Sequence, residues 1–234
     1  MVDLNNWAVI VPAHNSALNI LNTIDELAEY YQSKSLSGQV IIVENGSKDN
    51  TWEVMSSIDT TALPFALVRT QSEKGLGNAI REGLSKVSTD YVLITADDLP
   101  FGFSDLDEFL HREIDADIAI GSKAHPDTAG TRSFSREVMS KTFRLLRRVV
   151  IHVNLGDTQG TILGKAVPIC DLGTATRQEG YLMTTELLAI ATQNKKSIIE
   201  LPVQFRETIR KSNVKIISDS FKMFRGLFEV RRNL

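Results

Sequence analysis

Tyr91-Val-Leu-Ile-Thr-Ala-Asp-Asp-Leu-Pro100 is the stretch that decides the fold. Its first five residues are β-branched, aliphatic or aromatic and carry no charge, which predicts a buried strand. The run stops at Asp97 and Asp98, and Pro100 cannot continue a strand ladder. A buried parallel strand that ends in acids brings negative charge to the carboxyl edge of a sheet, where open α/β folds bind ligands. Such oxygen ligands suit a divalent cation that bridges substrate phosphates, although acids in a loop can equally be solvated or cap the next helix.

Strand-length apolar runs alternate with helical patterns through the first half of the chain. Helical spacing of apolar residues falls between the runs, and this alternation predicts an α/β fold with a doubly wound, mostly parallel central sheet and helices on both faces. Three strand ends would then place Asn15, Glu44 and Asp98 at one edge, within reach of one nucleotide. The predicted strands are 8–11, 40–43, 65–68, 91–95 and 118–120, and the predicted helices are 18–31, 51–58, 79–87 and 104–112.

The second half is less regular and more basic. Short strands are predicted over 161–163 and 198–203, the latter at a sheet edge because it contains Pro202. Two basic amphipathic helices are predicted over 134–153 and 217–232. Their apolar stripes can pack on the core, on a second copy of the chain in a homodimer, or on an anionic membrane surface. We expect at least part of each stripe to face the core.

Composition narrows the class of protein. The 234 residues are 42% hydrophobic and 24% charged, as expected for one large globular domain. Residues 1–117 carry 7 Lys and Arg against 19 Asp and Glu, whereas residues 118–234 carry 19 against 10. This asymmetry argues against nucleic acid as a partner and fits a site with one metal-binding wall and one anion-binding wall, although charge can also segregate by chance.

The expected location follows from absent signals. Cys170 is the single cysteine, so an internal disulfide is impossible and a reducing compartment is expected. No signal peptide or membrane-spanning run is recognisable. We therefore expect a cytoplasmic protein that is peripheral on the cytoplasmic membrane face.

Four motifs carry a resemblance to a known family. VIVPAHN at 9–15, ENGSKD at 44–49, KGLG at 74–77 and ADD at 96–98 follow one another along the chain. They are similar to the Pro-x-x-Asn, Asp-Asp-Gly-Ser-x-Asp, Lys-Gly-x-Gly and Asp-x-Asp motifs of inverting glycosyltransferases of family 2. The resemblance implies the GT-A (nucleotide-diphospho-sugar transferase) fold, a nucleotide-diphosphate sugar as donor, and Mg²⁺ or Mn²⁺ as cofactor.

Within that family, the second half most resembles the dolichyl- or polyprenyl-phosphate sugar transferases. GSK at 121–123, RSFSR at 132–136, DTQG at 157–160 and ELL at 186–188 match their Gly-Ser-Arg, Arg/Ser, Asp-Thr-Gln and Glu-Leu-Leu segments. The resemblance implies a single GT-A-like domain over 1–234. Residues 1–122 would bind the nucleotide sugar, and residues 123–234 would bind a lipid-phosphate acceptor at a membrane surface.

The resemblance also implies roles for particular residues. Asp98 would hold the metal and act in catalysis together with Asp97. Arg and Lys suit a phosphate dianion. A hydroxyl acceptor would instead require a carboxylate base, for which Glu186 and Asp157 are the candidates, unless both only bond to nearby backbone. The donor-binding residues would be Pro12, Ala13, Asn15, Glu44, Gly46, Ser47, Lys74, Gly77 and Asp97, and the acceptor-phosphate residues would be Lys123, Arg132, Arg136, Arg206, Arg210 and Lys211.

Departures from the family pattern keep alternatives open. Ser16 stands where the family usually has Glu, Glu44 replaces an Asp, and Ala96 replaces the first acid of Asp-x-Asp. Lys123 stands where the family has Arg, so a bidentate contact is lost there. The alternatives are a transferase acting on a sugar hydroxyl in polysaccharide or glycoconjugate synthesis, and a degenerate relative that binds nucleotide without turnover. A sugar-phosphate nucleotidyltransferase ranks lower because its glycine-rich basic opening is absent.

Overall fold

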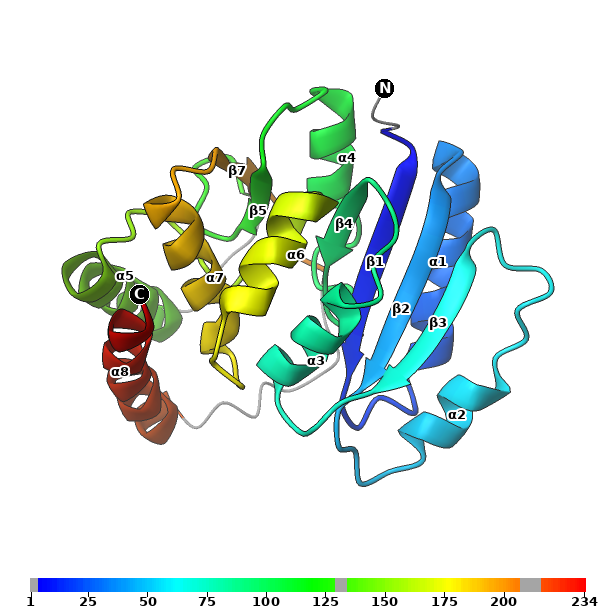
Figure 1. The fold of residues 1–234 in the computed structure, drawn as a ribbon, viewed down its shortest axis with the longest axis horizontal. Coiled ribbons are helices and arrows are strands. Elements are labelled where there is room, and N and C mark those ends of the chain that lie inside the picture. Colours follow the sequence, from blue (N-terminus) through cyan, green and yellow to red (C-terminus); the bar gives the residue numbers. More distant parts are fainter. Residues whose placement is uncertain (1–3, 129–133, 207–215) are drawn as a thin grey trace.

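A seven-stranded sheet forms the centre of the protein (Figure 1). The computed structural model describes residues 4–128, 134–206 and 216–234, with the backbone alone at 134–139 and 216–224. The strand order is β3-β2-β1-β4-β6-β5-β7. The strands are β1 (Asn6–Ala13), β2 (Ser37–Glu44), β3 (Ala66–Gln71), β4 (Tyr91–Ile94), β5 (Ile118–Ser122), β6 (Ile162–Lys165) and β7 (Ile198–Pro202).

Helices cover both faces of this sheet, as predicted, because its central strands are apolar on both sides. One face packs against α1, α2 and α4, and the other packs against α3, α6 and α7. The helices of these two layers are α1 (Ile20–Lys34), α2 (Thr51–Ser57), α4 (Ser104–His111), α3 (Leu76–Leu84), α6 (Ala166–Ala175) and α7 (Leu182–Gln193).

Strand register brings the predicted site residues to one edge. β1 pairs in parallel with β2, Ala13 opposite Glu44, and with β4, Ile10 opposite Ile94. The carboxyl ends of the three strands therefore lie next to one another. The predicted common edge for Asn15, Glu44 and Asp98 is confirmed at the level of topology.

The mostly parallel sheet is also confirmed, with one exception that the sequence did not indicate. β6 runs antiparallel to both of its neighbours, β4 and β5, while β7 pairs in parallel with β5 at the edge. The edge position of β7 agrees with the expectation drawn from Pro202.

Helix α6 was not predicted. It is apolar on most sides and so lacks a helical stripe, and it contains Pro168 and Gly173. Pro168 lies in the first turn, where proline does not disrupt the helix. The Cys170 thiol on this helix donates to the Leu84 carbonyl of α3 at 3.6 Å.

The two basic helices, α5 (Phe134–Ile151) and α8 (Ile216–Asn233), lie side by side at the end of the molecule farthest from α2 (Figure 1). They form a third apolar cluster with α7, in which Val150 and Ile151 meet Leu227 and Val230. Partial core packing of both helices is thus confirmed. No helix in the described part of the chain is long and apolar enough to cross a membrane.

Two leucines, one within α1 and one just before it, provide a test of this packing. Leu27 is fully buried, whereas Leu18 is 92% exposed. Leu27→Ala should lower the free energy of unfolding by about 2–5 kcal/mol because it leaves a cavity. Leu18→Ala should change it by less than about 0.5 kcal/mol. Chemical denaturation of both variants measures the difference, and equal losses would contradict the assigned packing.

Candidate functional site

The loop after β1 is hydrogen-bonded to the loop after β2. Asn15 has a positive φ of 53°, a conformation that asparagine tolerates better than most residues. Its N–H donates to Ser47 Oγ at 3.0 Å, and its Oδ1 accepts from the Lys48 N–H at 2.8 Å. Ser16 N–H donates to Thr51 Oγ1 at 2.8 Å. The two predicted donor-binding loops therefore form one unit.

Glu44 anchors the second loop from the end of β2. It is 6% exposed, and its Oε1 accepts from the Ser47 N–H at 2.5 Å while Oε2 accepts from Gln71 Nε2 at 3.2 Å. Gly46 has a φ of 76°, and a Cβ there would lie 3.1 Å from the Lys74 Cβ. This close approach brings Lys74 beside the loop that Glu44 closes.

The adjacent acids after β4 have different surroundings. Asp97 is 7% exposed and accepts from the Ser16 hydroxyl, and its backbone carbonyl accepts from Thr23 Oγ1 at 2.5 Å. Asp98 is half-buried and precedes Leu99, which has a φ of 42°. Ser16 thus gives Asp97 a hydroxyl donor, where a glutamate would have brought a second carboxylate. Asp97 is held by the β1–α1 loop, and Asp98 is the more exposed acid.

Three of the predicted donor-binding residues are closely packed. Gly77 N–H donates to the Glu179 carbonyl at 2.7 Å, and a Cβ at Gly77 would clash with the Gln178 carbonyl. The glycine therefore permits close approach of another backbone segment. Pro12 and Ala13 are buried at the end of β1, so only their backbone could reach a ligand.

The loop that follows Asp98 meets the second half of the chain. The Arg206 N–H donates to the Pro100 carbonyl at 3.0 Å, and a Cβ at Gly102 would lie 2.8 Å from Arg206 Nε. Lys123 Nζ lies 6.0 Å from the Phe101 ring centroid. Two of the predicted acceptor residues, Lys123 and Arg206, therefore lie beside the loop after β4 that contains Asp97 and Asp98. We call this loop the acidic loop. The Arg206 guanidinium also pairs with Glu26 of α1.

The other four predicted acceptor residues are not placed by the structure. Arg132, Arg210 and Lys211 lie outside the described residues, and Arg136 is described only by its backbone. Their role in phosphate binding stays a prediction.

Comparison with known proteins identifies the family. The family model for glycosyl transferase family 2 matches residues 8–165. The chain belongs to this family. This family 2 chain is similar to the dolichyl-phosphate beta-glucosyltransferase of Saccharomyces cerevisiae, with 24% identity over 96% of the chain and 73% of the yeast protein. The Dictyostelium discoideum protein of the same description is 25% identical with the same coverage.

A solved structure shows the same fold. Glucosyl-3-phosphoglycerate synthase from Mycobacterium tuberculosis, crystallised with Mn²⁺, UDP-glucose and phosphoglyceric acid, superposes with a TM-score of 0.68. The alignment covers 97% of the family 2 chain and 80% of the synthase at 16% identity. The GT-A fold expected from the sequence is thereby confirmed.

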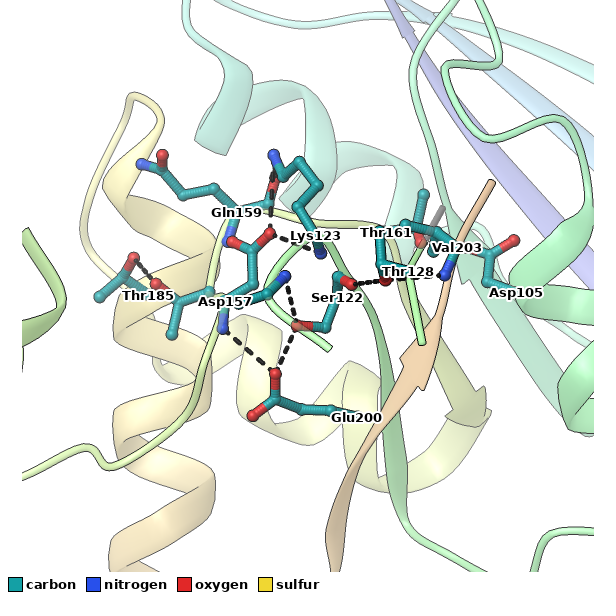
Figure 2. A network of polar contacts seen from close by, with 12 residues as sticks. Asp105, Ser122, Lys123, Thr128, Asp157, Gln159, Thr161, Thr185, Glu200 and Val203 are labelled. Carbon is teal, nitrogen blue, oxygen red and sulfur yellow. Dashed lines mark hydrogen bonds and ion pairs between the residues drawn. The ribbon is translucent and has the colours of Figure 1, made fainter. Parts of the chain in front are cut away.

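Figure 2 shows how the predicted acceptor segment is held in this family 2 chain. Asp157 Oδ2 accepts from the Lys123 N–H at 3.2 Å and lies 3.7 Å from Lys123 Nζ, and Asp157 Oδ1 accepts from the Gln159 N–H at 2.8 Å. Lys123 Nζ also donates to the Gln159 carbonyl at 3.2 Å. Asp157 therefore orients Lys123 as well as closing its own turn.

Glu200 on β7 binds the same turn from one side. It accepts from the Ser122 hydroxyl at 2.5 Å, from the Gly156 N–H at 2.6 Å and from the Asp157 N–H at 3.3 Å. We did not predict this residue. A single acid inside the apolar strand Ile198–Pro202 was the available signal, because a charge in such a strand needs partners.

Arg147 of α5 binds the turn from the other side. It is 1% exposed, it donates to Thr158 Oγ1 at 2.9 Å and to the Leu155 carbonyl, and Thr158 Oγ1 lies 2.9 Å from Thr185 Oγ1. Burial lowers the pKa of Arg147 to about 10, against the opposing influence of Asp157. Arg147 lies four residues after Phe143, on the apolar side of the helix, and this position was the missed signal.

Glu186 is committed to structural hydrogen bonds. It is fully buried, Oε2 accepts from the Arg177 and Gln178 N–H groups at 2.8 and 2.7 Å, and Oε1 accepts from Asn233 Nδ2 at 2.9 Å. The acid joins the loop before α7 to the end of α8. These contacts include bonds to nearby backbone, which was the structural alternative to a role for Glu186 as a base.

The carboxylates suit a cation that arrives with a substrate. Among the residues that the structure describes, no three His, Cys, Asp or Glu side chains form a ready-made metal cluster. Mg²⁺ is commonly held by one or two carboxylates together with substrate phosphates and water. The half-buried Asp98, in the loop after β4, fits this requirement.

Asp105, at the start of α4, provides a pH test of the network in Figure 2. It is 1% exposed, and burial raises the pKa of its carboxyl although Thr161 donates to it. A raised folded-state pKa means that the protonated acid stabilises the fold at low pH, and this contribution is lost as pH rises through that pKa. The stability of wild type minus that of Asp105→Asn should therefore fall as pH rises above about 4, the ordinary pKa of an aspartate.

The exposed Asp59 is the control for this slope. A hydrogen bond from the Thr61 N–H lowers the pKa of Asp59, so wild type should lose stability relative to Asp59→Asn as pH falls. Denaturation at several pH values measures both differences. A flat or rising difference for Asp105→Asn would contradict the burial argument.

Glu200→Gln tests whether Glu200 holds the turn formed by residues 155–158 in place. The amide can offer only one accepting oxygen to three donors, so unfolding free energy should fall by about 1–3 kcal/mol. Amide exchange at Gly156 and Asp157 should accelerate. The exposed Glu73 is the matched control, and Glu73→Gln should cost less than about 0.5 kcal/mol. Unchanged amide exchange at Gly156 and Asp157 would show that Glu200 does not hold this turn.

Proposed function

We propose that the protein is an inverting glycosyltransferase that moves a sugar from a nucleotide-diphosphate sugar to the phosphate of a polyprenyl phosphate. Family membership and the similarity to dolichyl-phosphate beta-glucosyltransferases support the donor and acceptor classes. The choice of acceptor rests on one observation, which is that both candidate bases already accept hydrogen bonds from the protein. Glu186 accepts three hydrogen bonds in the interior, and Asp157 is bonded to the Lys123 and Gln159 backbone.

A hydroxyl acceptor needs a base within hydrogen-bond reach. A phosphate monoester has a second pKa near 6, so its oxygens are already ionised at neutral pH. Such a nucleophile needs cations that position it and no strong base. Lys123 and Arg206 beside the acidic loop are suited to this task. Because both carboxylates already accept hydrogen bonds from the protein, a phosphate acceptor is favoured over a sugar hydroxyl.

The reaction requires a cation on the side of the site that binds the diphosphate and basic residues on the side that binds the acceptor phosphate. An acceptor phosphate oxygen bonds to the anomeric carbon as the bond from that carbon to the diphosphate oxygen breaks, and the nucleoside diphosphate leaves with the electron pair. Mg²⁺ or Mn²⁺, with Asp98 as its ligand, would neutralise the charge that develops on the diphosphate. Asn15, Glu44 and Ser47 would hold the nucleotide at the edge that their hydrogen bonds make rigid. Asp97, fixed by Ser16, would support the Asp98 loop from behind.

Transfer of radiolabelled glucose from UDP-glucose to a short-chain polyprenyl phosphate in detergent tests the function. Label should enter the organic-extractable product and depend on Mg²⁺ or Mn²⁺. Asp98→Asn should lower turnover by at least about 100-fold, because the variant loses several kcal/mol of charge stabilisation. The exposed Asp59→Asn should retain wild-type turnover. Equal transfer to a water-soluble sugar would count against the lipid acceptor, and full activity of Asp98→Asn would refute the metal role.

A further inference from the structure

Helix α5 has an exposed outer face that combines aliphatic and basic residues. Lys141, Leu145, Arg148 and Val149 follow the spacing i, i+4, i+7 and i+8, which places them on one side of a helix. All four are exposed, and Leu145 and Val149 are 63% and 62% exposed. We call these four residues the docking face. Large aliphatic side chains so exposed and so close together indicate a surface that contacts another apolar medium.

The opposite side of α5 already satisfies the core. Val150 and Ile151 pack in the cluster that contains Leu182 of α7 and Leu227 and Val230 of α8. The two aliphatic residues of the docking face are thus additional to the stripe that the fold needs. Their exposure is not explained by helix packing.

Charge decides which partner fits this face. The exposed cations of the docking face are Lys141 and Arg148, and residues 140–151 include no acid. On the neighbouring α8, Phe228 is 50% exposed between the exposed Arg225 and Arg232, although Arg225 also pairs with Glu229. A two-fold contact with a second copy would bring the same basic residues together. Cations interleaved with apolar side chains instead match an anionic lipid surface.

We propose that the docking face lies on an anionic lipid bilayer and inserts Leu145 and Val149 at the headgroup boundary. The inference rests on the proposed lipid-phosphate acceptor, which such a surface would present. The same helix supplies Arg147, which binds Leu155 and Thr158 on its inner side. α5 therefore connects the bilayer directly to the turn that orients Lys123.

Vesicle co-sedimentation tests the docking face. Wild type should bind vesicles of phosphatidylcholine with phosphatidylglycerol, bind pure phosphatidylcholine weakly, and lose binding at high salt. Leu145→Glu combined with Val149→Glu should weaken binding at least about tenfold, and Arg148→Ala should weaken it about fivefold. Val167→Glu is the matched control, because Val167 is 73% exposed on α6 and lies outside the docking face. This control should bind as wild type does.

Unfolding transitions of the variants show whether the fold is intact. Equal vesicle binding by wild type and the double variant would overturn the proposal. So would a double variant that turns a dimer into a monomer in sedimentation velocity with vesicle binding unchanged, since the face would then be a contact between copies. The detergent assay separates this inference from the proposed function. If wild type shows no transfer there but the double variant still loses vesicle binding, the docking face stands and the acceptor assignment falls.

Discussion

Parallel pairing of β1 between β2 and β4 is the constraint on which the rest of the structure depends. The register fixes where the three strands end, and each end is followed by a loop with a predicted donor-binding residue. Hydrogen bonds then join the loops themselves, from Asn15 to Ser47 and from Ser16 to Asp97. The edge is therefore rigid because both its strands and its loops are paired. A ligand that bridges these loops would find its partners already in place.

A second set of buried polar groups holds the other wall. Glu200 binds backbone N–H groups of the 155–158 turn, while Arg147 binds a carbonyl and a hydroxyl of the same turn. Opposite charges on the two sides of one segment satisfy donors and acceptors that would otherwise be costly to bury. The result is a fixed Asp157 and, through it, a fixed Lys123. Both walls are thus organised by backbone contacts more than by side-chain pairs.

Local sequence patterns predicted the strands well, because an apolar run bounded by polar residues identifies a buried strand without reference to its neighbours. The pattern failed for α6, whose side chains are apolar almost all round. It also could not pair Ser16 with Asp97, which lie 81 residues apart in the chain. Sequence therefore located the acids and basic residues of the site. Only the fold distinguished the buried Asp97 and Glu186 from the half-buried Asp98.

The lone thiol on α6 has a practical use. Cys170 is half-buried, and burial raises its thiol pKa, so little of the reactive thiolate exists at neutral pH. A cysteine introduced at a well-exposed position would react with maleimide probes first. Fluorescent or spin labels could therefore be attached to one chosen helix while the native sulfur is left in place.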